Sequence, residues 1–67
     1  MFVGVHGDYA WELSNGELKV DSVNPKIGHL RTFEAPSAFN NAEQATWFAQ
    51  GRIDVHGDEL AALAARS

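Results

Sequence analysis

The dipeptide Asn15-Gly16 constrains the fold of this chain more than any other feature, because it separates two short segments rich in apolar residues. A two-residue Asn-Gly loop favours a type I′ turn, whose positive φ angles few other residues adopt at low cost. Such a turn fixes the register of a β-hairpin, with Leu13 opposite Leu18 and Trp11 opposite Val20. The sequence therefore predicts a hairpin with one apolar face.

The two faces of the predicted hairpin differ in character. Its apolar face carries Tyr9, Trp11, Leu13, Leu18 and Val20. Its other face carries Glu12 opposite Lys19, which we expect to form an ion pair, with Ala10 and Asp21 beside them. The first face is expected to lie on the core and the second to face solvent.

Further strands are predicted on both sides of the hairpin. Residues 1–6, which include Phe2, Val3 and Val5, are expected to form a short strand, and Asn24-Pro25-Lys26 is a turn signal that leads into a strand over residues 28–33. If Val23 opposes Ile27 across that turn, Val20 opposes Leu30 and Asp21 opposes His29. In the same register Leu18 opposes Thr32 and Lys19 opposes Arg31. The prediction is an antiparallel sheet of three to four strands.

After Pro36 the apolar spacing becomes helical. Asn40 and Asn41 are good N-cap residues, each with Glu43 or Gln44 three positions later. The apolar face of this helix comprises Ala42, Ala45, Phe48 and Ala49, and Gly51 is predicted to end it. A second helix is expected to start with Asp58 as its N-cap, with Glu59 in its first turn, Arg66 in its last and a stripe of Leu60, Leu63 and Ala64. Residues 52–56 are predicted to form a short strand or an extended link.

Together these elements predict a single small α+β domain over residues 1–67, with two helices on one face of the antiparallel sheet. The chain has 67 residues, no cysteine and a formal net charge of −4 from nine acidic and five basic residues. Disulfides and thiolate sites are therefore excluded, and the charge disfavours direct nucleic-acid binding. We expect no signal peptide, no membrane contact and a cytoplasmic location in the host cell.

The tetrapeptide Val-His-Gly-Asp occurs twice, at residues 5–8 and 55–58. If the two segments converge, His6, His56 and Asp58 could bind a metal such as zinc, as a small metal protein or an enzyme fragment. The other interpretation is that each segment only ends an element and turns the chain. Elsewhere Asp21 and His29 are expected to pair without a nucleophile, so we predict no catalytic residue, no cofactor and no enzyme activity.

Trp47 is the candidate anchor for a protein partner. In the predicted helix it lies away from the alanine stripe, among Glu43, Gln44 and Gln50, and an aromatic residue on a polar helix face is typical of a binding hot spot. The alternative is that its ring folds over the helix edge into the core. Beside Trp47, the predicted partner-binding residues are Glu43, Glu12, Asp21 and Tyr9.

The order of elements resembles a family. The Asn15-Gly16 hairpin, a strand over residues 28–33, then Glu43-Gln44, Trp47-Phe48, Gly51 and Arg52-Ile53 are similar to small phage-encoded anti-CRISPR proteins, in particular a type I-F inhibitor with an antiparallel sheet and two helices. The spacing between Gln44 and Trp47 differs from that family by one residue, and only Tyr9 matches its tyrosine-rich contact surface. The resemblance implies a cofactor-free cytosolic inhibitor from a phage or mobile element, which binds a host CRISPR-Cas effector and blocks it sterically. A nucleic-acid-binding regulator is the further alternative, if the chain forms a homodimer that pools Lys19, Lys26, Arg31 and Arg52.

Overall fold

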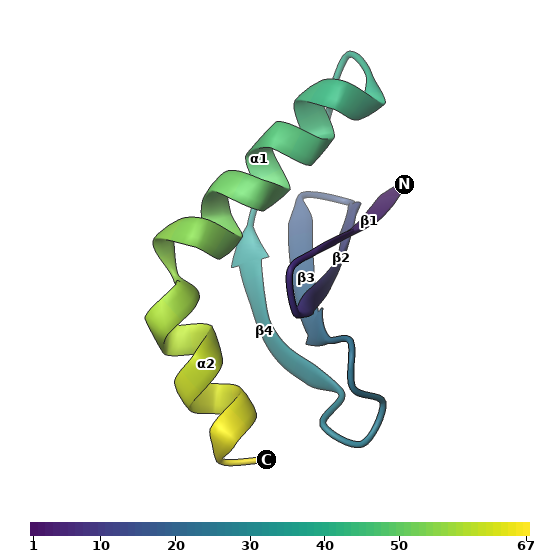
Figure 1. Cartoon of the computed structure of the whole chain (residues 1–67). Coiled ribbons are helices and arrows are strands. Elements are labelled where there is room, and N and C mark those ends of the chain that lie inside the picture. Colours follow the sequence, from purple (N-terminus) through teal and green to yellow (C-terminus); the bar gives the residue numbers. More distant parts are fainter.

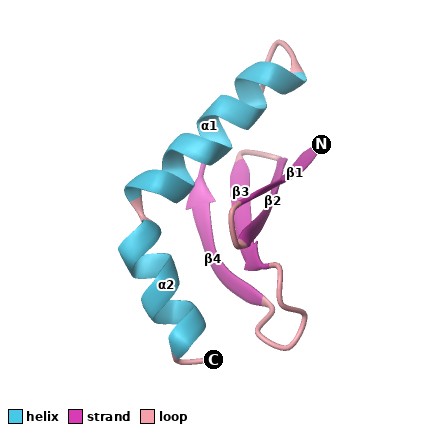
Figure 2. Ribbon diagram, viewed as in Figure 1, coloured by secondary structure: helices cyan, strands magenta, loops and turns pink.

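A computed structural model describes residues 1–67 and shows an α+β fold (Figure 1). Four strands form one antiparallel sheet in the order β1-β2-β3-β4. The elements are β1 (Phe2–His6), β2 (Tyr9–Ser14), β3 (Glu17–Ser22), β4 (His29–Glu34), α1 (Ala42–Val55) and α2 (Gly57–Ala65). Figure 2 shows the two helices running end to end along the sheet, so the predicted architecture is confirmed.

The hairpin of β2 and β3 has the predicted register. Asn15 and Gly16 adopt φ angles of 52° and 79°, as a type I′ turn requires. Leu13 pairs with Leu18 and Trp11 with Val20. Glu12 also lies opposite Lys19, but their side chains form no ion pair, so that part of the prediction is wrong.

The pairing of β3 with β4 differs from the prediction by one residue over most of its length. Asp21 lies opposite His29 as expected, but the register then shifts, and Val20 pairs with Arg31 rather than Leu30. Leu18 consequently pairs with Phe33, and Lys19 with Thr32. The irregularity is a bulge that brings Phe33, rather than Thr32, onto the apolar face of the sheet, where its ring is buried.

The core lies between this apolar face and the helices. It contains nine buried residues, which are Trp11, Leu13, Leu18, Val20, Phe33, Ala45, Ala49, Ile53 and Leu60. The small side chains of Ala45 and Ala49 let α1 lie close to the sheet. Both helices therefore cover one face and leave the other uncovered.

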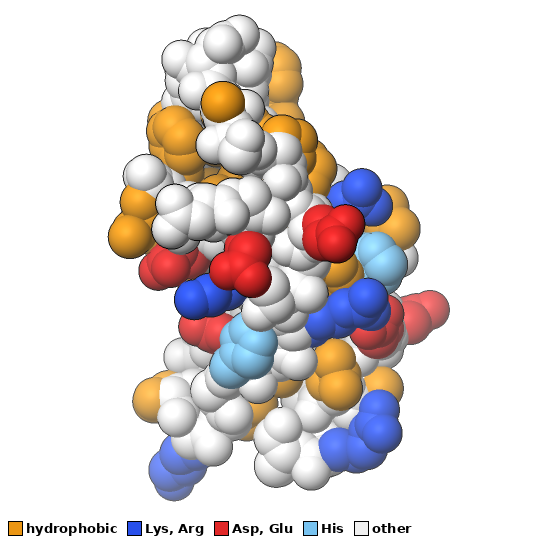
Figure 3. Space-filling view, turned by 180° about the vertical axis from the view of Figure 1, so that it is seen from behind, with side chains coloured by type: hydrophobic (Ala, Val, Ile, Leu, Met, Phe, Trp, Pro, Cys, Tyr) orange, Lys and Arg blue, Asp and Glu red, His pale blue; other side chains and the backbone are white.

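We call the uncovered side of the sheet the open face. By strand alternation it carries Val3, Val5, Ala10, Glu12, Ser14, Glu17, Lys19, Asp21, His29, Thr32 and Glu34. Figure 3, seen from behind Figure 1, shows acidic, basic and histidine side chains interspersed across the middle of the molecule. Solvation accounts for such a mixed surface.

Helix α1 begins as predicted and ends later than predicted. The Asn41 side chain accepts a hydrogen bond of 2.9 Å from the Gln44 backbone N–H, which caps the first turn. The prediction that Gly51 ends the helix is wrong, because α1 continues to Val55. Ile53 follows Ala45 and Ala49 at helical spacing and is buried, and this burial offsets the helix cost of a glycine.

The predicted strand or link over residues 52–56 is therefore helical, and Asp58 is not the N-cap of the second helix. Helix α2 begins at Gly57, directly after His56, whose φ and ψ of −102° and 19° break the helical path. Asp58 and Glu59 lie in the first turn of α2, and Arg66 follows its last residue as the C-cap. Neither helix has the length and apolar character needed to cross a membrane.

Candidate functional site

An exposed apolar patch runs along the side of α1 that faces away from the sheet. We call it the α1 patch, and it comprises Trp47, Phe48, Gly51, Arg52 and Val55. Trp47 and Val55 are 64% and 75% exposed, so the indole is not folded into the core. The patch borders a shallow hollow of about 320 Å³ that is wide open to solvent.

Gly51 opens the middle of this patch. It lies four residues from both Trp47 and Val55, so the three positions follow one another along one helix face. A Cβ added at Gly51 would meet no atom within 4 Å. The fold itself therefore does not require glycine here, although glycine in a helix interior costs about 1 kcal/mol relative to alanine.

The α1 patch includes one charged residue, Arg52, and other charged residues lie beside it. Glu43 is exposed in the first turn of α1, one turn before Trp47. The Arg52 guanidinium lies 5.4 Å from the centre of the Phe48 ring and forms no ion pair. Asp54 is exposed and accepts a hydrogen bond of 2.8 Å from His6 Nε2 in β1. The patch thus combines a large aromatic surface with charges of both signs.

On the open face, Asp21, His29 and Thr32 form a hydrogen-bonded row. His29 Nδ1 lies 2.7 Å from Asp21 Oδ1, which confirms the predicted pair, and His29 Nε2 lies 3.2 Å from Thr32 Oγ1. The order carboxylate, imidazole, hydroxyl is that of a hydrolytic triad. However, the Asp21 and His29 side chains are 50% and 52% exposed on the open face. Solvent competes for an exposed pair of this kind, which contributes typically under about 1 kcal/mol.

His6 and His56 have separate partners. His6 binds Asp54, whereas the His56 ring packs 4.7 Å from the Phe33 ring and its Nδ1 lies 3.4 Å from Glu59 Oε1. No group of three or more His, Cys, Asp or Glu side chains could hold a metal ion. The predicted cluster of His6, His56 and Asp58 is therefore not formed.

A polar cluster joins β4 to α2 and was not predicted from the sequence. Arg31 forms an ion pair with Glu59, and its guanidinium lies 4.6 Å from the centre of the Phe33 ring. The hydrogen bond from Arg31, with a smaller contribution from His56, holds the pKa of the Glu59 carboxyl below its ordinary value. Arg31 is far from His56 and Glu59 in sequence. Their contact depends on residues 52–56 being helical, which was not predicted.

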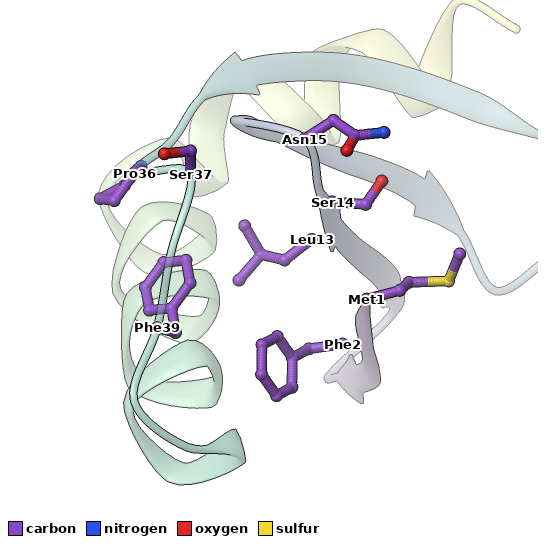
Figure 4. A pocket seen from close by; sticks show the side chains of 8 residues that line it. All are labelled: Met1, Phe2, Leu13, Ser14, Asn15, Pro36, Ser37 and Phe39. Atoms are coloured by element: carbon purple, nitrogen blue, oxygen red, sulfur yellow. The ribbon is translucent and has the colours of Figure 1, made fainter.

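A second hollow lies at the end of the β2–β3 hairpin. Figure 4 shows Phe2, Leu13 and Phe39 directed toward one another at its base. Its volume is about 330 Å³, and Met1, Ser14, Asn15, Pro36 and Ser37 complete its lining. It contains no acidic, basic or histidine side chain, so it offers no side-chain acid or base for chemistry.

The five predicted partner-binding residues do not form one surface. Trp47 and Glu43 lie on α1, whereas Glu12 and Asp21 lie on the open face, on the other side of the sheet from the helices. Tyr9 is half-buried and packs against the core. Gly51, Arg52 and Val55 were not predicted to lie together beside Trp47, because the helix was predicted to end at Gly51.

Comparison with known proteins adds no relative, since no protein-family model, curated protein or solved structure matches the chain.

Proposed function

We propose that this chain is a protein-interaction module that docks on a protein partner through the α1 patch. The observation that carries the proposal is Trp47, a large aromatic side chain held 64% exposed beside a glycine that opens a hollow. A tryptophan brings a large apolar area with little rotamer entropy, which is why it is enriched at binding hot spots. No other exposed aromatic side chain on this chain is comparable.

Gly51 supports the same interpretation independently. A glycine that the fold does not need, placed at a helix-destabilising position between two exposed apolar side chains, leaves room for a partner group to approach the helix backbone. A partner side chain inserted there would contact Trp47 on one side and Val55 on the other. The charges of Glu43 and Arg52 would then select among partners at the rim.

The partner class to test first follows from the resemblance and the charge. The order of elements is similar to a type I-F anti-CRISPR inhibitor, and a net charge of −4 suits docking on the basic nucleic-acid channel of an effector complex. The proposed mechanism is steric occlusion by a phage or mobile-element inhibitor, with no chemistry of its own. Glu43 beside the patch would face the basic partner surface.

Affinity capture with purified CRISPR effector complexes tests this function. The parent chain is expected to bind one effector type, and Trp47→Ala should weaken binding by about 2 kcal/mol, or about 30-fold, with an unchanged melting temperature. Val23→Ala, which also truncates an exposed apolar side chain outside the patch, is the matched control. Binding that survives Trp47→Ala would contradict the α1 patch, and no binding to any effector would contradict the partner class.

Gly51→Ala separates stability from binding. The new methyl group meets no atom of the chain, so α1 should gain up to about 1 kcal/mol of stability. The same methyl group narrows the hollow, so affinity for the partner should fall while the melting temperature rises. A variant that is more stable and binds as well as the parent would show that the hollow is not used.

A further inference from the structure

The exposed edge of β1 is a second candidate interaction surface, and it does not overlap the α1 patch. The strand order places β1 at one border of the sheet (Figure 1). Its Val3 and Val5 side chains are 67% and 64% exposed on the open face. The proposed partner interaction of α1 accounts for neither of them.

Strand geometry determines which backbone groups of β1 are free. β1 and β2 are joined by a two-residue loop, and the flanking pair His6–Tyr9 closes the hairpin. In antiparallel strands the hydrogen-bonded residues alternate, so Phe2, Gly4 and His6 turn their backbone groups toward β2. The N–H and C=O groups of Val3 and Val5 therefore point away from the sheet. No backbone hydrogen bond outside the helices and strands involves any residue of β1.

The two edges of the sheet are protected very differently. At the opposite edge, β4 carries Arg31 and Glu34, and a bulge interrupts its pairing with β3. Charges and bulges are the usual features that prevent an edge strand from pairing with another chain. β1 has no Lys, Arg, Asp, Glu or Pro and pairs with β2 in unbroken register. Its edge is thus open to strand addition.

We infer that β1 pairs with β1 of a second copy of this chain, antiparallel and about a two-fold axis at Gly4. In this register Val3 lies opposite Val5 of the second copy, and Val5 opposite its Val3. All four outward-facing N–H groups of the two valine pairs then find a C=O acceptor, and the sheet becomes continuous through both copies. This is the only two-fold register that pairs every residue of β1.

Side chains on both faces fit this arrangement. On the open face the four valines become neighbours, which covers apolar surface that one copy leaves exposed. On the other face Gly4 lies opposite Gly4 of the second copy, so residue 4 itself contributes no side chain at the axis. The Trp11 ring of each copy covers its own Gly4, and the half-buried Phe2 lies opposite His6 of the second copy. An isologous interface of this kind is self-complementary by symmetry. Each dimer would carry two separate α1 patches.

Sedimentation velocity over a range of protein concentrations, together with NMR on a mixture of labelled and unlabelled chain, tests the inference. We expect a dimer with an intermolecular contact between the Gly4 Hα protons of the two copies, as a non-hydrogen-bonded antiparallel pair gives. The Val3 and Val5 amides should exchange more slowly as the concentration rises. A chain that is monomeric up to the concentrations used for NMR, or a dimer without the Gly4 contact, would overturn the inference.

The variant Val3→Lys/Val5→Lys places like charges opposite one another across the axis and should raise the dimer Kd by about 100-fold or more. In one copy these lysines lie on the open face, where Val3 is opposite Glu12, so each copy should remain folded. Val23→Lys is the control, since Val23 is also exposed but lies outside the edge. A dimer that withstands the double substitution, or that Val23→Lys breaks equally, would exclude this interface. The double substitution leaves Trp47 unchanged, so binding of a protein partner by the α1 patch can be measured independently of dimer formation.

Discussion

Gly4 and Trp11 illustrate how one position can depend on its neighbour across the sheet. A Cβ at Gly4 would lie 2.5 Å from Cζ2 of the Trp11 ring, which is closer than atoms in contact can approach. Trp11 is almost fully buried, and its indole N–H has no hydrogen-bond partner. The large ring therefore fills the core but leaves its buried indole N–H without a hydrogen-bond acceptor. The ring fits at this place only because residue 4 has no side chain.

At the residue scale, Gly4→Ala should lower the free energy of unfolding by about 2 kcal/mol, because the buried ring cannot move aside without repacking the core. Urea denaturation at low protein concentration measures the effect. Gly57→Ala, whose new Cβ would meet no atom within 4 Å, is the control. Trp11→Phe in the Gly4→Ala chain should reduce the penalty, and a penalty that is independent of residue 11 would contradict the clash.

Helix α2 is attached to the sheet by few contacts. Leu60 is its only fully buried residue, and the Arg31–Glu59 ion pair links its first turn to β4. His56 lies between Phe33 and Glu59, so the junction of the two helices is also part of this attachment. The position of α2 thus depends on one apolar anchor and one charged cluster.

At the element scale, the charged cluster predicts a pH dependence. Since the Glu59 pKa is lowered in the folded chain, the ion pair stabilises fully at pH values above the ordinary glutamate pKa of about 4.3. The contribution is lost as the pH falls through the lower pKa of the folded state. Glu59→Gln should therefore melt at a lower temperature than the parent near neutral pH, and this difference should shrink in acid. Glu17→Gln, at an exposed residue without an ion pair, should show no such trend.

The whole molecule has a single core that joins distant segments. Residues of β2, β3, β4, α1 and α2 meet in one cluster of nine, and Phe2 of β1 packs against it. A chain of this size buries about 60% of the surface that its unfolded form exposes, so its free energy of unfolding is small. Removing any one large core side chain should affect every element.

At the scale of the whole molecule, Leu60→Ala should therefore lower the free energy of unfolding by about 2–4 kcal/mol and destabilise the sheet together with α2. Thermal unfolding followed by far-ultraviolet and near-ultraviolet circular dichroism should give coincident transitions at a reduced melting temperature. Separate transitions, with the near-ultraviolet signal unchanged, would mean that α2 is an independent appendage. Leu63→Ala, at a half-buried position of the same helix, should have a smaller effect.

Features that depend on neighbouring residues could be predicted from the sequence. Asn15-Gly16 determined the β2–β3 register, because a two-residue turn admits one pairing of the strands beside it. Asn41 determined the start of α1, because its side chain reaches a backbone N–H three residues away. Helical spacing placed Trp47 away from Ala45 and Ala49 but left open whether its ring folds into the core, and the structure shows the side chain exposed. The prediction of a partner-binding role for Trp47 stays a prediction.

Other features were decided only by tertiary contacts. The tetrapeptide Val-His-Gly-Asp forms a strand end and a turn at residues 5–8, yet it forms a helix junction at residues 55–58. The local sequence is identical in both places, so the difference arises from the surroundings. The first segment pairs with β2, whereas the second lies between Ile53 and Leu60, which are both buried in the core. Burial of Ile53 also favours the continuation of α1 past Gly51. This continuation places Gly51, Arg52 and Val55 on the same helix as Trp47 and so forms the α1 patch. The intrinsic helix or strand preference of one residue contributes about 1 kcal/mol or less to the free energy of folding. Burial of one large apolar side chain in a shared core contributes more.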